Sequence, residues 1–292
     1  MKKIVVIGLG DVSKYVIKGI EKSNSFEIVA ICDNNPKRIE EFLDLGVDKF
    51  LDYKEMIKEK EFDYVVLLVH HFNRLHILNE LISKKIKVIC EKPIACSLKE
   101  LELLLYYCNL YNNFPIIMYH RSYNSMIEKF FKMFDENNVK MIDINYLEDI
   151  SIHSSTDDYK HLSDACGGGC VQDNFPNCVH YLLSHGNLSL IDYKTTKSLN
   201  NIYSESAKVK MLFNGIPCNI NLDWNSEIDD KSIIVYCDKK IVELNLQSNY
   251  KKPKESLIDE YCNFFKTFEN FDFTKCSLID KQIVELINTI IN

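Results

Sequence analysis

The amino-terminal residues 1–33 read MKKIVVIGLGDVSKYVIKGIEKSNSFEIVAICD, at the start of a chain of 292 residues. Apolar runs predict strands over residues 2–7 and 26–32. Between them, apolar residues recur at helical spacing from position 12 to position 20. A glycine pair separates the first strand from this helix, and Asp33 closes the second strand. This succession of strand, glycine turn, helix, strand and acid is typical of a βαβ unit that binds a dinucleotide.

The glycine turn, Gly8-Leu9-Gly10, explains how such a ligand is held. Gly8 allows a tight turn, and Gly10 lets the backbone approach a pyrophosphate that sits on the helix N-terminus. Asp11 and Val12 begin that helix and are predicted cofactor contacts. The third glycine of the fingerprint is absent, because Ser13 stands in its place. The alternative is a doubly wound domain whose turn binds nothing.

Asp33 bears on which nicotinamide cofactor is bound. A carboxylate at the end of the second strand accepts hydrogen bonds from the ribose diol of NAD and repels the 2′-phosphate of NADP. The sequence therefore predicts NAD, with NADP disfavoured. Lys37 and Arg38 lie nearby and could soften this preference. Alternatively, Asp33 is an ordinary turn residue ahead of the Asn-Asn-Pro at 34–36.

Length and composition set the frame for the remaining chain. A length of 292 residues allows two ordinary domains, and a hydrophobic content of 46% is globular. The net charge of −7, without a basic block, argues against nucleic acid as a partner. The longest apolar runs, such as residues 64–69, are too short to span a bilayer. The start resembles a strand more than a signal peptide, so we expect a cytoplasmic protein whose 11 cysteines are free thiols.

Alternating strands and helices continue to about residue 119. A helix is expected over 37–45, and the continuous apolar run at 64–69 indicates a strand buried on both faces. This strand delivers a predicted loop, His70 to Asn73, to the carboxyl edge of the sheet, where ligands bind. Further elements are a helix over 75–83 with His76, a strand over 87–90 followed by Glu91-Lys92-Pro93, a capped helix over 97–111 and a strand over 115–119. Residues 1–119 are thus predicted to be a doubly wound α/β domain.

The pattern changes after His120, and residues 120–292 are predicted to be a second domain. Short consecutive strands with turn residues between them indicate an α+β domain with an open, mostly antiparallel sheet. Strands are expected over 139–147, 208–213, 218–222, 233–237 and 241–246, and helices over 124–134, 175–184, 257–268 and 280–291. An uncovered sheet face commonly meets a partner, so we expect a homodimer or homotetramer formed through this sheet.

The ordered set of motifs resembles the glucose–fructose oxidoreductase, inositol dehydrogenase and MocA (Gfo/Idh/MocA) family, whose first domain is a Rossmann fold. The resemblance rests on Gly8-Leu9-Gly10, Asn73 with His76, Glu91-Lys92-Pro93, the stretch 119–123, and Gly167-Gly168-Gly169 followed by Asp173. It implies an NAD(P)-dependent enzyme that oxidises or reduces a sugar, a cyclitol or a nucleotide sugar. It also implies cofactor contacts at His70, Asn73, His76, Glu91 and Lys92.

The resemblance further implies a catalytic set of Lys92, Asp173 and a histidine four residues beyond that aspartate. Asn177 occupies this last position, and His180 follows three residues later. Asparagine cannot exchange the hydroxyl proton that alcohol oxidation requires. We therefore expect Lys92 and Asp173 to orient the substrate hydroxyl, and Lys92 or His180 to exchange its proton. Asn177 would only hydrogen-bond to the sugar. Alternatively, His180 packs against the sheet.

Four further alternatives remain open at this stage. Arg121 and Tyr123 are candidate substrate contacts, with Arg121 binding an anionic group or forming a structural ion pair instead. Zinc could be held by the cysteines and histidines at 161, 166, 170, 178 and 180, but these lack metal-ligand spacing, so we predict no metal. Because Asn177 replaces the histidine, the chain could also be an NAD-binding sensor without catalysis. A redox-neutral, NAD-dependent glycosidase is the last possibility.

Overall fold

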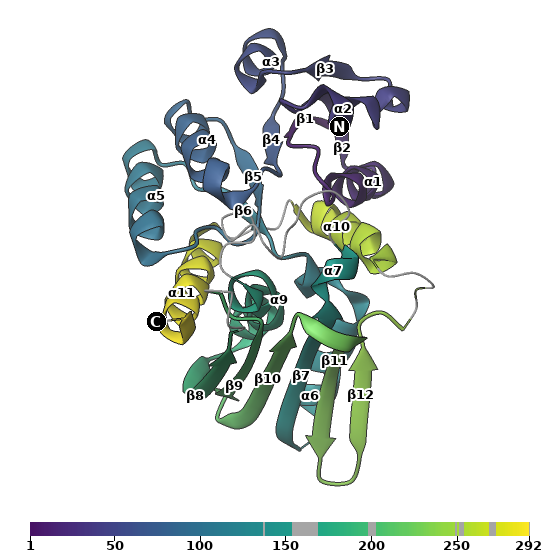
Figure 1. Cartoon of the computed structure of the whole chain (residues 1–292), viewed down its shortest axis with the longest axis vertical. Coiled ribbons are helices and arrows are strands. Elements are labelled where there is room, and N and C mark those ends of the chain that lie inside the picture. The colour runs from purple at the N-terminus through teal and green to yellow at the C-terminus, as the bar shows by residue number, and fades with distance from the viewer. Residues whose placement is uncertain are drawn as a thin grey trace. The chain divides into compact units, whose positions relative to one another are not determined.

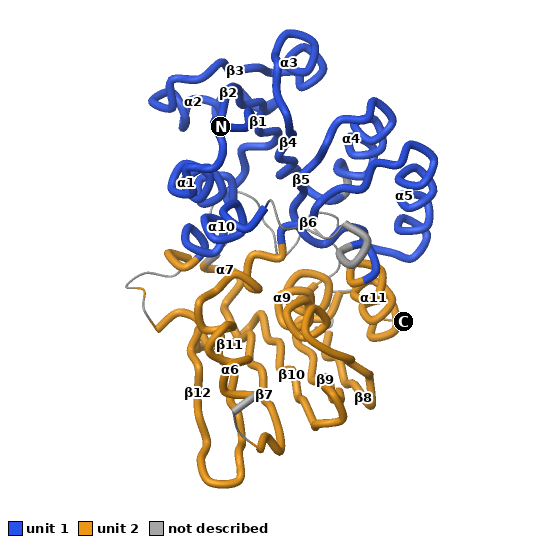
Figure 2. Tube along the Cα trace, turned by 180° about the vertical axis from the view of Figure 1, so that it is seen from behind, with its two compact units in different colours: residues 1–118, 257–278 blue, residues 119–256, 279–292 orange. Residues whose placement is uncertain are grey.

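The computed structural model describes residues 1–136, 138–153, 169–197, 203–248, 250, 254–268 and 273–291. These residues fold into two compact units, which Figure 2 distinguishes by colour. The first unit contains Met1–Met118 and Leu257–Leu278, and the second contains Tyr119–Ser256 and Ile279–Asn292. The linear division into 1–119 and 120–292 differs from this arrangement, because sequence order does not show that a late helix returns to the first unit.

The first unit is built on a six-stranded sheet in the order β3-β2-β1-β4-β5-β6. Every neighbouring pair in this sheet is parallel. The strand order reverses between β1 and β4, which is the point where ligands bind in doubly wound sheets. The strands are β1 (Lys2–Ile7), β2 (Phe26–Cys32), β3 (Asp48–Phe50), β4 (Tyr64–Leu67), β5 (Val88–Glu91) and β6 (Ile116–Met118). The predicted doubly wound α/β domain is confirmed.

Helices cover both faces of this sheet, because right-handed crossovers in opposite directions place α1 and α4 on opposite sides (Figure 1). They are α1 (Ser13–Ser23), α2 (Pro36–Glu40), η1 (Leu43–Leu45), α3 (Tyr53–Glu59), α4 (His71–Ser83), α5 (Leu98–Tyr111) and α10 (Glu255–Thr267). At α5 the predicted cap forms, since the Glu100 N–H donates to Ser97 Oγ at 3.2 Å.

Helix α10 packs onto the first unit through aromatic residues. Phe26 of β2 makes edge-to-face contacts with Phe265 and Phe268, at 5.5 and 5.2 Å between ring centroids. Tyr64 of β4 meets Phe268 at 4.9 Å. A Cβ on Gly19 of α1 would lie 2.6 Å from Tyr261 Cβ, so only glycine permits this close approach of α1 to α10. Each such aromatic pair adds about 1 kcal/mol beyond the burial of its surface.

The second unit contains a six-stranded sheet in the order β12-β11-β7-β10-β9-β8. Only the β7–β10 pair is parallel, so the prediction of a mostly antiparallel sheet is confirmed. The strands are β7 (Val139–Asp149), β8 (Leu188–Thr196), β9 (Ser206–Phe213), β10 (Ile216–Asp223), β11 (Asn225–Cys237) and β12 (Ile241–Asn245). The helical segments are η2 (His120–Tyr123), α6 (Ser125–Glu136), α7 (Ile150–His153), α9 (Cys170–His185) and α11 (Phe273–Ile291).

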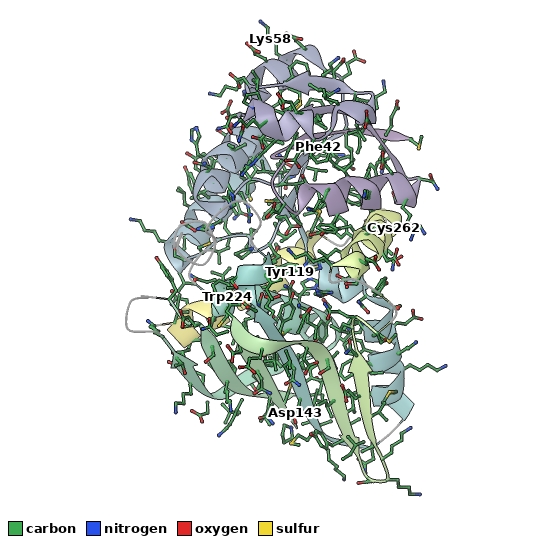
Figure 3. The ribbon with its side chains drawn as sticks, turned by 45° about the vertical axis from the view of Figure 1, so that its right-hand side comes forward. Phe42, Lys58, Tyr119, Asp143, Trp224 and Cys262 are labelled. Atoms are coloured by element: carbon green, nitrogen blue, oxygen red, sulfur yellow. The ribbon has the colours of Figure 1, made fainter. Side chains whose placement is uncertain are left out.

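The two faces of the second sheet differ in character. Strand β7 alternates, with Ile142 and Ile144 buried on the face that packs against α9. The opposite face carries polar side chains, among them Asp143, which Figure 3 labels. Asn219 Nδ2 donates to Asp143 Oδ1 at 2.7 Å, and Asn221 Nδ2 donates to Asn145 Oδ1 at 3.0 Å. The face opposite α9 is thus half-exposed and hydrogen-bonded across strands.

Several predicted boundaries are wrong, and the errors at α4 and α9 share a cause. The expected loop at His70 to Asn73 is mostly helix, because α4 begins at His71. Helix α9 begins at Cys170, five residues before the expected start, so Asp173 lies inside it. Neither helix has a side-chain cap that the sequence could show. The helix expected over 37–45 is interrupted, with α2 ending at Glu40 before the short η1.

Among the helices in the described part of the chain, none combines the length and apolar character needed to cross a membrane.

Candidate active site

The glycine turn after β1 has the geometry that a dinucleotide requires. Gly8 has φ +94°, and a Cβ there would lie 2.9 Å from Leu68 C and Val69 N. Only glycine fits this position, and it holds the turn against the end of β4. At Gly10, by contrast, a Cβ would meet no described atom within 4 Å. The described residues therefore leave space beside the backbone at Gly10, and the approach of a pyrophosphate there stays a prediction.

The N-terminus of α1 lies directly after this turn. Val12 occupies the cap position, and no side chain caps the helix there. Ser13 is fully buried, and its hydroxyl donates to Gly10 O at 2.6 Å. Serine at this position thus stabilises the turn in place of the missing glycine. Since amide N–H groups at a helix N-terminus attract anions, the uncapped end of α1 fits a diphosphate. Half-buried Asp11 adds a negative charge beside it.

Asp33 lies at the carboxyl end of β2 and is 6% exposed. Its carboxylate accepts hydrogen bonds from the Leu9 N–H at 2.7 Å and the Asn35 N–H at 2.8 Å. Arg38 Nη1 lies 3.9 Å from Asp33 Oδ2. Each carboxylate oxygen has two lone pairs, so capacity remains for a ribose diol. Asp33 therefore links the glycine turn to the predicted adenosine end of the cofactor.

The start of α4 places three other predicted cofactor residues. His70 is the cap residue of α4 and is half-buried. Asn73 and His76 are exposed and lie three residues apart, on one face of the helix. Their roles as cofactor contacts stay predictions.

The turn after β5 holds Glu91 and Lys92. Glu91 is 6% exposed, and its Oε1 accepts a hydrogen bond from the Tyr261 hydroxyl of α10 at 2.5 Å. Its other oxygen accepts the Lys92 N–H at 3.2 Å. These contacts give the Glu91 carboxylate a structural role in addition to the predicted one. The Lys92 side chain is half-buried, so it is within reach of a bound molecule.

In the second unit, α9 carries Asp173, Asn177 and His180. Almost every residue of α9 up to Leu183 is buried. The exceptions are Asp173 and His180, which are half-buried. With 100° per residue, Asp173, Asn177 and His180 fall within about 60° of one another on the helix. Asp173 and His180 are therefore partly accessible on one side of this helix, and buried Asn177 lies between them.

The side-chain amide of Asn177 has a hydrogen-bond partner for its nitrogen and none among the described residues for its oxygen. Asn177 is 3% exposed, and its Nδ2 donates weakly to the Tyr146 hydroxyl at 3.4 Å. Its buried Oδ1 has no hydrogen-bond partner among the residues that the structure describes. Buried amide oxygens are nearly always satisfied, so this atom is a ready acceptor for a hydroxyl donor.

Tyr146 on β7 is a site residue that the sequence did not single out. The Arg121 guanidinium lies 5.6 Å and Lys231 Nζ 5.1 Å from its ring centroid, distances typical of cation–π contacts. Burial raises the pKa of Tyr146, so its phenol stays protonated. Lys231 is in turn 3.1 Å from Glu148 Oε2. The sequence could have indicated Tyr146 in one way. A tyrosine, which carries a polar hydroxyl, stands on the apolar face of an alternating strand.

Arg121 and Tyr123 lie in η2, ahead of α6. Arg121 is 3% exposed, and its Nη1 donates to Ser256 Oγ at 3.0 Å. Tyr123 is half-buried.

His180 packs on η2 and on Tyr119, the residue before it. Its Nδ1 lies 2.6 Å from Ser122 Oγ, and its ring stacks on Tyr119 with centroids 4.1 Å apart. Figure 3 labels Tyr119, whose hydroxyl donates to Asp280 at 2.8 Å. The imidazole is thus held on one face and at one nitrogen.

No group of three metal-ligating side chains occurs among the described residues. Cys170 and Cys178 are buried, and neither forms a disulfide with a described cysteine. His161 and Cys166, together with Gly167 and Gly168, lie outside the described residues.

The chain is similar in sequence and in fold to known oxidoreductases. Residues 2–116 match the Gfo/Idh/MocA family, described as an oxidoreductase family with an NAD-binding Rossmann fold. Glucose-6-phosphate 3-dehydrogenase of Bacillus subtilis (strain 168) is 30% identical over 105 residues, which are 36% of this chain and 29% of that protein. The chain thus matches under a third of that relative's length.

Solved structures resemble the whole chain. Myo-inositol 2-dehydrogenase from Lactobacillus plantarum superposes with a TM-score of 0.79 at 15% identity, over 99% of this chain and 97% of that one. The WlbA dehydrogenase from Bordetella pertussis, in complex with NADH and UDP-GlcNAcA, gives a TM-score of 0.76 at 16% identity, over 98% and 93%. At these identities the likeness establishes a shared fold.

Proposed function

We propose, from the match of residues 2–116, that the chain belongs to the Gfo/Idh/MocA oxidoreductase family and that NAD is the cofactor of its first unit. On this premise, we propose that it is a dehydrogenase or reductase that acts on a CH–OH group of a sugar, cyclitol or nucleotide sugar. The observation that carries the proposal is Asn177, whose buried amide oxygen has no hydrogen-bond partner among the described residues and lies on the same side of α9 as half-buried Asp173 and His180. Polyols are rich in such donors.

The described residues fit the cofactor. The tight turn at Gly8, the open backbone at Gly10 and the uncapped start of α1 together suit a diphosphate. Asp33 has lone pairs left for a ribose diol and repels a 2′-phosphate. Bound NAD supplies a hydride acceptor in alcohol oxidation, and NADH supplies the hydride in the reverse reaction.

The chain's own residues then bind the substrate and move one proton. Asn177 Oδ1 accepts a hydrogen bond from one hydroxyl, and Asp173 orients another. In oxidation, the neutral amine of Lys92 takes the proton of the reacting hydroxyl as the hydride leaves the carbon for bound NAD, so that a carbonyl forms. Lys92 supports this role because its side chain is half-buried and its backbone is fixed beside Glu91. His180 is the second candidate for this proton, since its ring is already oriented by Ser122 and Tyr119.

Replacing Lys92 tests this proposal. In Lys92→Ala we expect turnover to fall by roughly 10²–10⁴-fold, because the proton then has no acceptor. The NADH dissociation constant, followed by nicotinamide fluorescence, is expected to stay within about 3-fold, a difference of under 1 kcal/mol. Lys99→Ala, at an exposed lysine in the same unit, is the matched control. Equal loss of turnover and of NADH binding would contradict a catalytic role.

The substrates to test are those that the relatives' names suggest: glucose 6-phosphate, myo-inositol and UDP-GlcNAcA. Turnover is read as a steady change in nicotinamide absorbance.

A second function, an NAD-binding sensor without catalysis, is favoured by one observation. Asn177 stands where the family resemblance expects a histidine, and an amide cannot exchange a proton near neutral pH. The sensor predicts tight NADH binding and sugar binding without any change in nicotinamide absorbance. Release of a free sugar without net cofactor change would instead indicate the redox-neutral glycosidase.

The protein is proposed to be a cytoplasmic homo-oligomer. The nine cysteines whose side chains the structure describes form no disulfide with one another, as suits a reducing compartment. The half-exposed sheet face around Asp143 and Asn221 is the surface proposed to pair with a second copy. Light scattering of the purified protein checks this, and a monomeric mass would contradict it.

A further inference from the structure

Helix α4 buries an arginine where its neighbours are apolar. Arg74 is 6% exposed, and it shares the buried side of the helix with Leu78 and Leu81, which are both 0% exposed. Residues at i and i+4 stack on one helix face, so Arg74 occupies a core position. Burying a guanidinium is costly unless hydrogen bonds compensate it. The sequence analysis did not single out this residue.

The compensation comes from three backbone carbonyls. Arg74 Nη1 donates to Glu91 O and to Pro93 O, both at 2.7 Å. Its Nε and Nη2 donate to Val69 O, at 3.2 and 3.0 Å. Glu91 and Pro93 are the two residues that flank Lys92, and Val69 follows β4. One buried guanidinium therefore connects the carbonyl groups of the residues before and after Lys92 to the segment that follows the neighbouring strand β4.

The fork geometry suits this task. A guanidinium is planar, always charged, and holds its donors in fixed directions, whereas a lysine ammonium is a single point. Hydrogen bonds from a charged donor are also the stronger kind. The Glu91 side chain adds a further restraint, because it accepts from the Tyr261 hydroxyl and from the Lys92 N–H. Within the first unit, the turn Glu91-Lys92-Pro93 is thus held by hydrogen bonds to its backbone carbonyls and to the Glu91 side chain.

We propose that Arg74 is the positioning residue for Lys92, holding the turn so that the amine is presented in one orientation. This inference rests on the proposed function, in which Lys92 exchanges the proton. Small errors in placement matter for such a group, since a shift of about 1 Å can cost about 10²-fold in rate.

A measurement without substrate tests the placement directly. Competitive labelling with acetic anhydride, read by peptide mass spectrometry, compares the reactivity of Lys92 with that of exposed Lys99 in the same molecule. In Arg74→Ala, Lys92 is expected to label severalfold faster, while Lys99 is unchanged. Free guanidinium at about 20 mM, far below denaturing concentrations, fills the vacated space and is expected to restore the original reactivity.

Two variants keep the test interpretable. Arg74→Lys retains the charge but cannot reach carbonyls on both sides of Lys92, so it is expected to behave like Arg74→Ala without rescue by guanidinium. Lys84→Ala removes an exposed cation from the C-terminal end of the same helix, where it pairs with Glu80, and is expected to leave Lys92 labelling unchanged. Unchanged Lys92 labelling in a folded Arg74→Ala protein overturns the inference. So does full activity of Arg74→Lys.

Measurements of turnover distinguish a failure of the positioning role of Arg74 from a failure of the catalytic role of Lys92. When Lys92→Ala abolishes turnover and Arg74→Ala lowers kcat about 10²-fold, with NADH binding retained and rescue by guanidinium, both stand. When Lys92→Ala abolishes turnover but Arg74→Ala does not lower it, only the positioning role fails. When Lys92→Ala turns over normally, the catalytic assignment itself fails.

Discussion

At the scale of single residues, Asp33 has two roles. Its carboxylate orders the glycine turn by accepting the Leu9 and Asn35 N–H groups. It also carries the negative charge that is predicted to exclude a 2′-phosphate. Removing the side chain would disturb both roles together, so a test of cofactor selectivity must keep an acceptor oxygen in place.

Asp33→Asn meets this condition. The amide keeps one acceptor oxygen and removes the charge, so we expect NADH to bind more weakly relative to NADPH. The ratio of their dissociation constants should shift by about 10-fold, or about 1.4 kcal/mol. Fluorescence titrations with both cofactors measure it. Asn35→Ser, which keeps the cap of α2, is the control and should leave the ratio unchanged. Parallel losses for NADH and NADPH would show that the charge does not discriminate.

The predictability of the site also varies residue by residue. Lys92, Asp173 and Asn177 were identified from ordered motifs, because their spacing along the chain is characteristic. Arg74 and Tyr146 were missed, because their importance lies in contacts with distant carbonyls and cations. An arginine on an apolar helix stripe is visible in a sequence, but which atoms compensate its charge is not.

At the scale of elements, the N-terminus of α1 combines an attractive and a repulsive feature for a diphosphate. Its uncapped N–H groups attract the anion, and Asp11 in the preceding turn opposes it. Asp11→Asn is therefore expected to tighten NADH binding by about 2- to 5-fold, the range of one charge near a helix end. Titrations at low and high salt measure the gain, which should shrink at high salt.

Glu21→Gln provides the matched control. It removes an exposed carboxylate at the far end of the same helix and should not change NADH affinity. Weaker binding in Asp11→Asn would mean that the Asp11 side chain supports the turn and does not repel the ligand.

The predictability of elements depended on where their signals lie. Strands β1, β2 and β4 were read correctly, since long apolar runs bury both faces of a parallel sheet. The starts of α4 and α9 were wrong, because no Ser, Thr, Asp or Asn caps them. Strand β11 begins earlier than the sequence predicted. Its first residues, Asn225 to Asp230, are mostly polar and mostly exposed, so they lack the apolar pattern that identifies a strand.

At the scale of the whole molecule, Asp280 makes stability depend on pH. Burial raises the pKa of Asp280 from 3.8 to about 7, partly opposed by the hydrogen bond from Tyr119. The folded state therefore binds this proton more tightly than the unfolded state does. The resulting stabilisation is fully present below pH 3.8 and is lost as the pH rises to about 7.

Asp280→Asn removes this titration and keeps an acceptor for the Tyr119 hydroxyl. We expect the variant to gain stability over the wild type as the pH is raised from 5 to 8, because only the wild type must then bury a charge. Thermal unfolding of both proteins across this range measures the difference. A gap in Tm that does not change with pH would mean that Asp280 is ionised at both ends of the range.

The two-unit architecture was the most predictable feature of the molecule, and the membership of α10 was the least. Alternation of strands and helices follows from local patterns, whereas the contacts of Phe265 and Phe268 with Phe26 join residues more than two hundred positions apart. No local pattern encodes such a choice of partner.

The hydrogen bond from Tyr261 to Glu91 has a consequence for how this gene can be rearranged. The first unit cannot be transferred as one continuous segment, because a fragment that stops at Met118 lacks α10. Such a fragment would leave Phe26 and Tyr64 without their aromatic cover and Glu91 without its phenolic donor. A chimera that exchanges the first unit between relatives must therefore exchange Leu257–Leu278 as well as Met1–Met118. Otherwise the exchanged unit loses the contacts that α10 makes with its sheet.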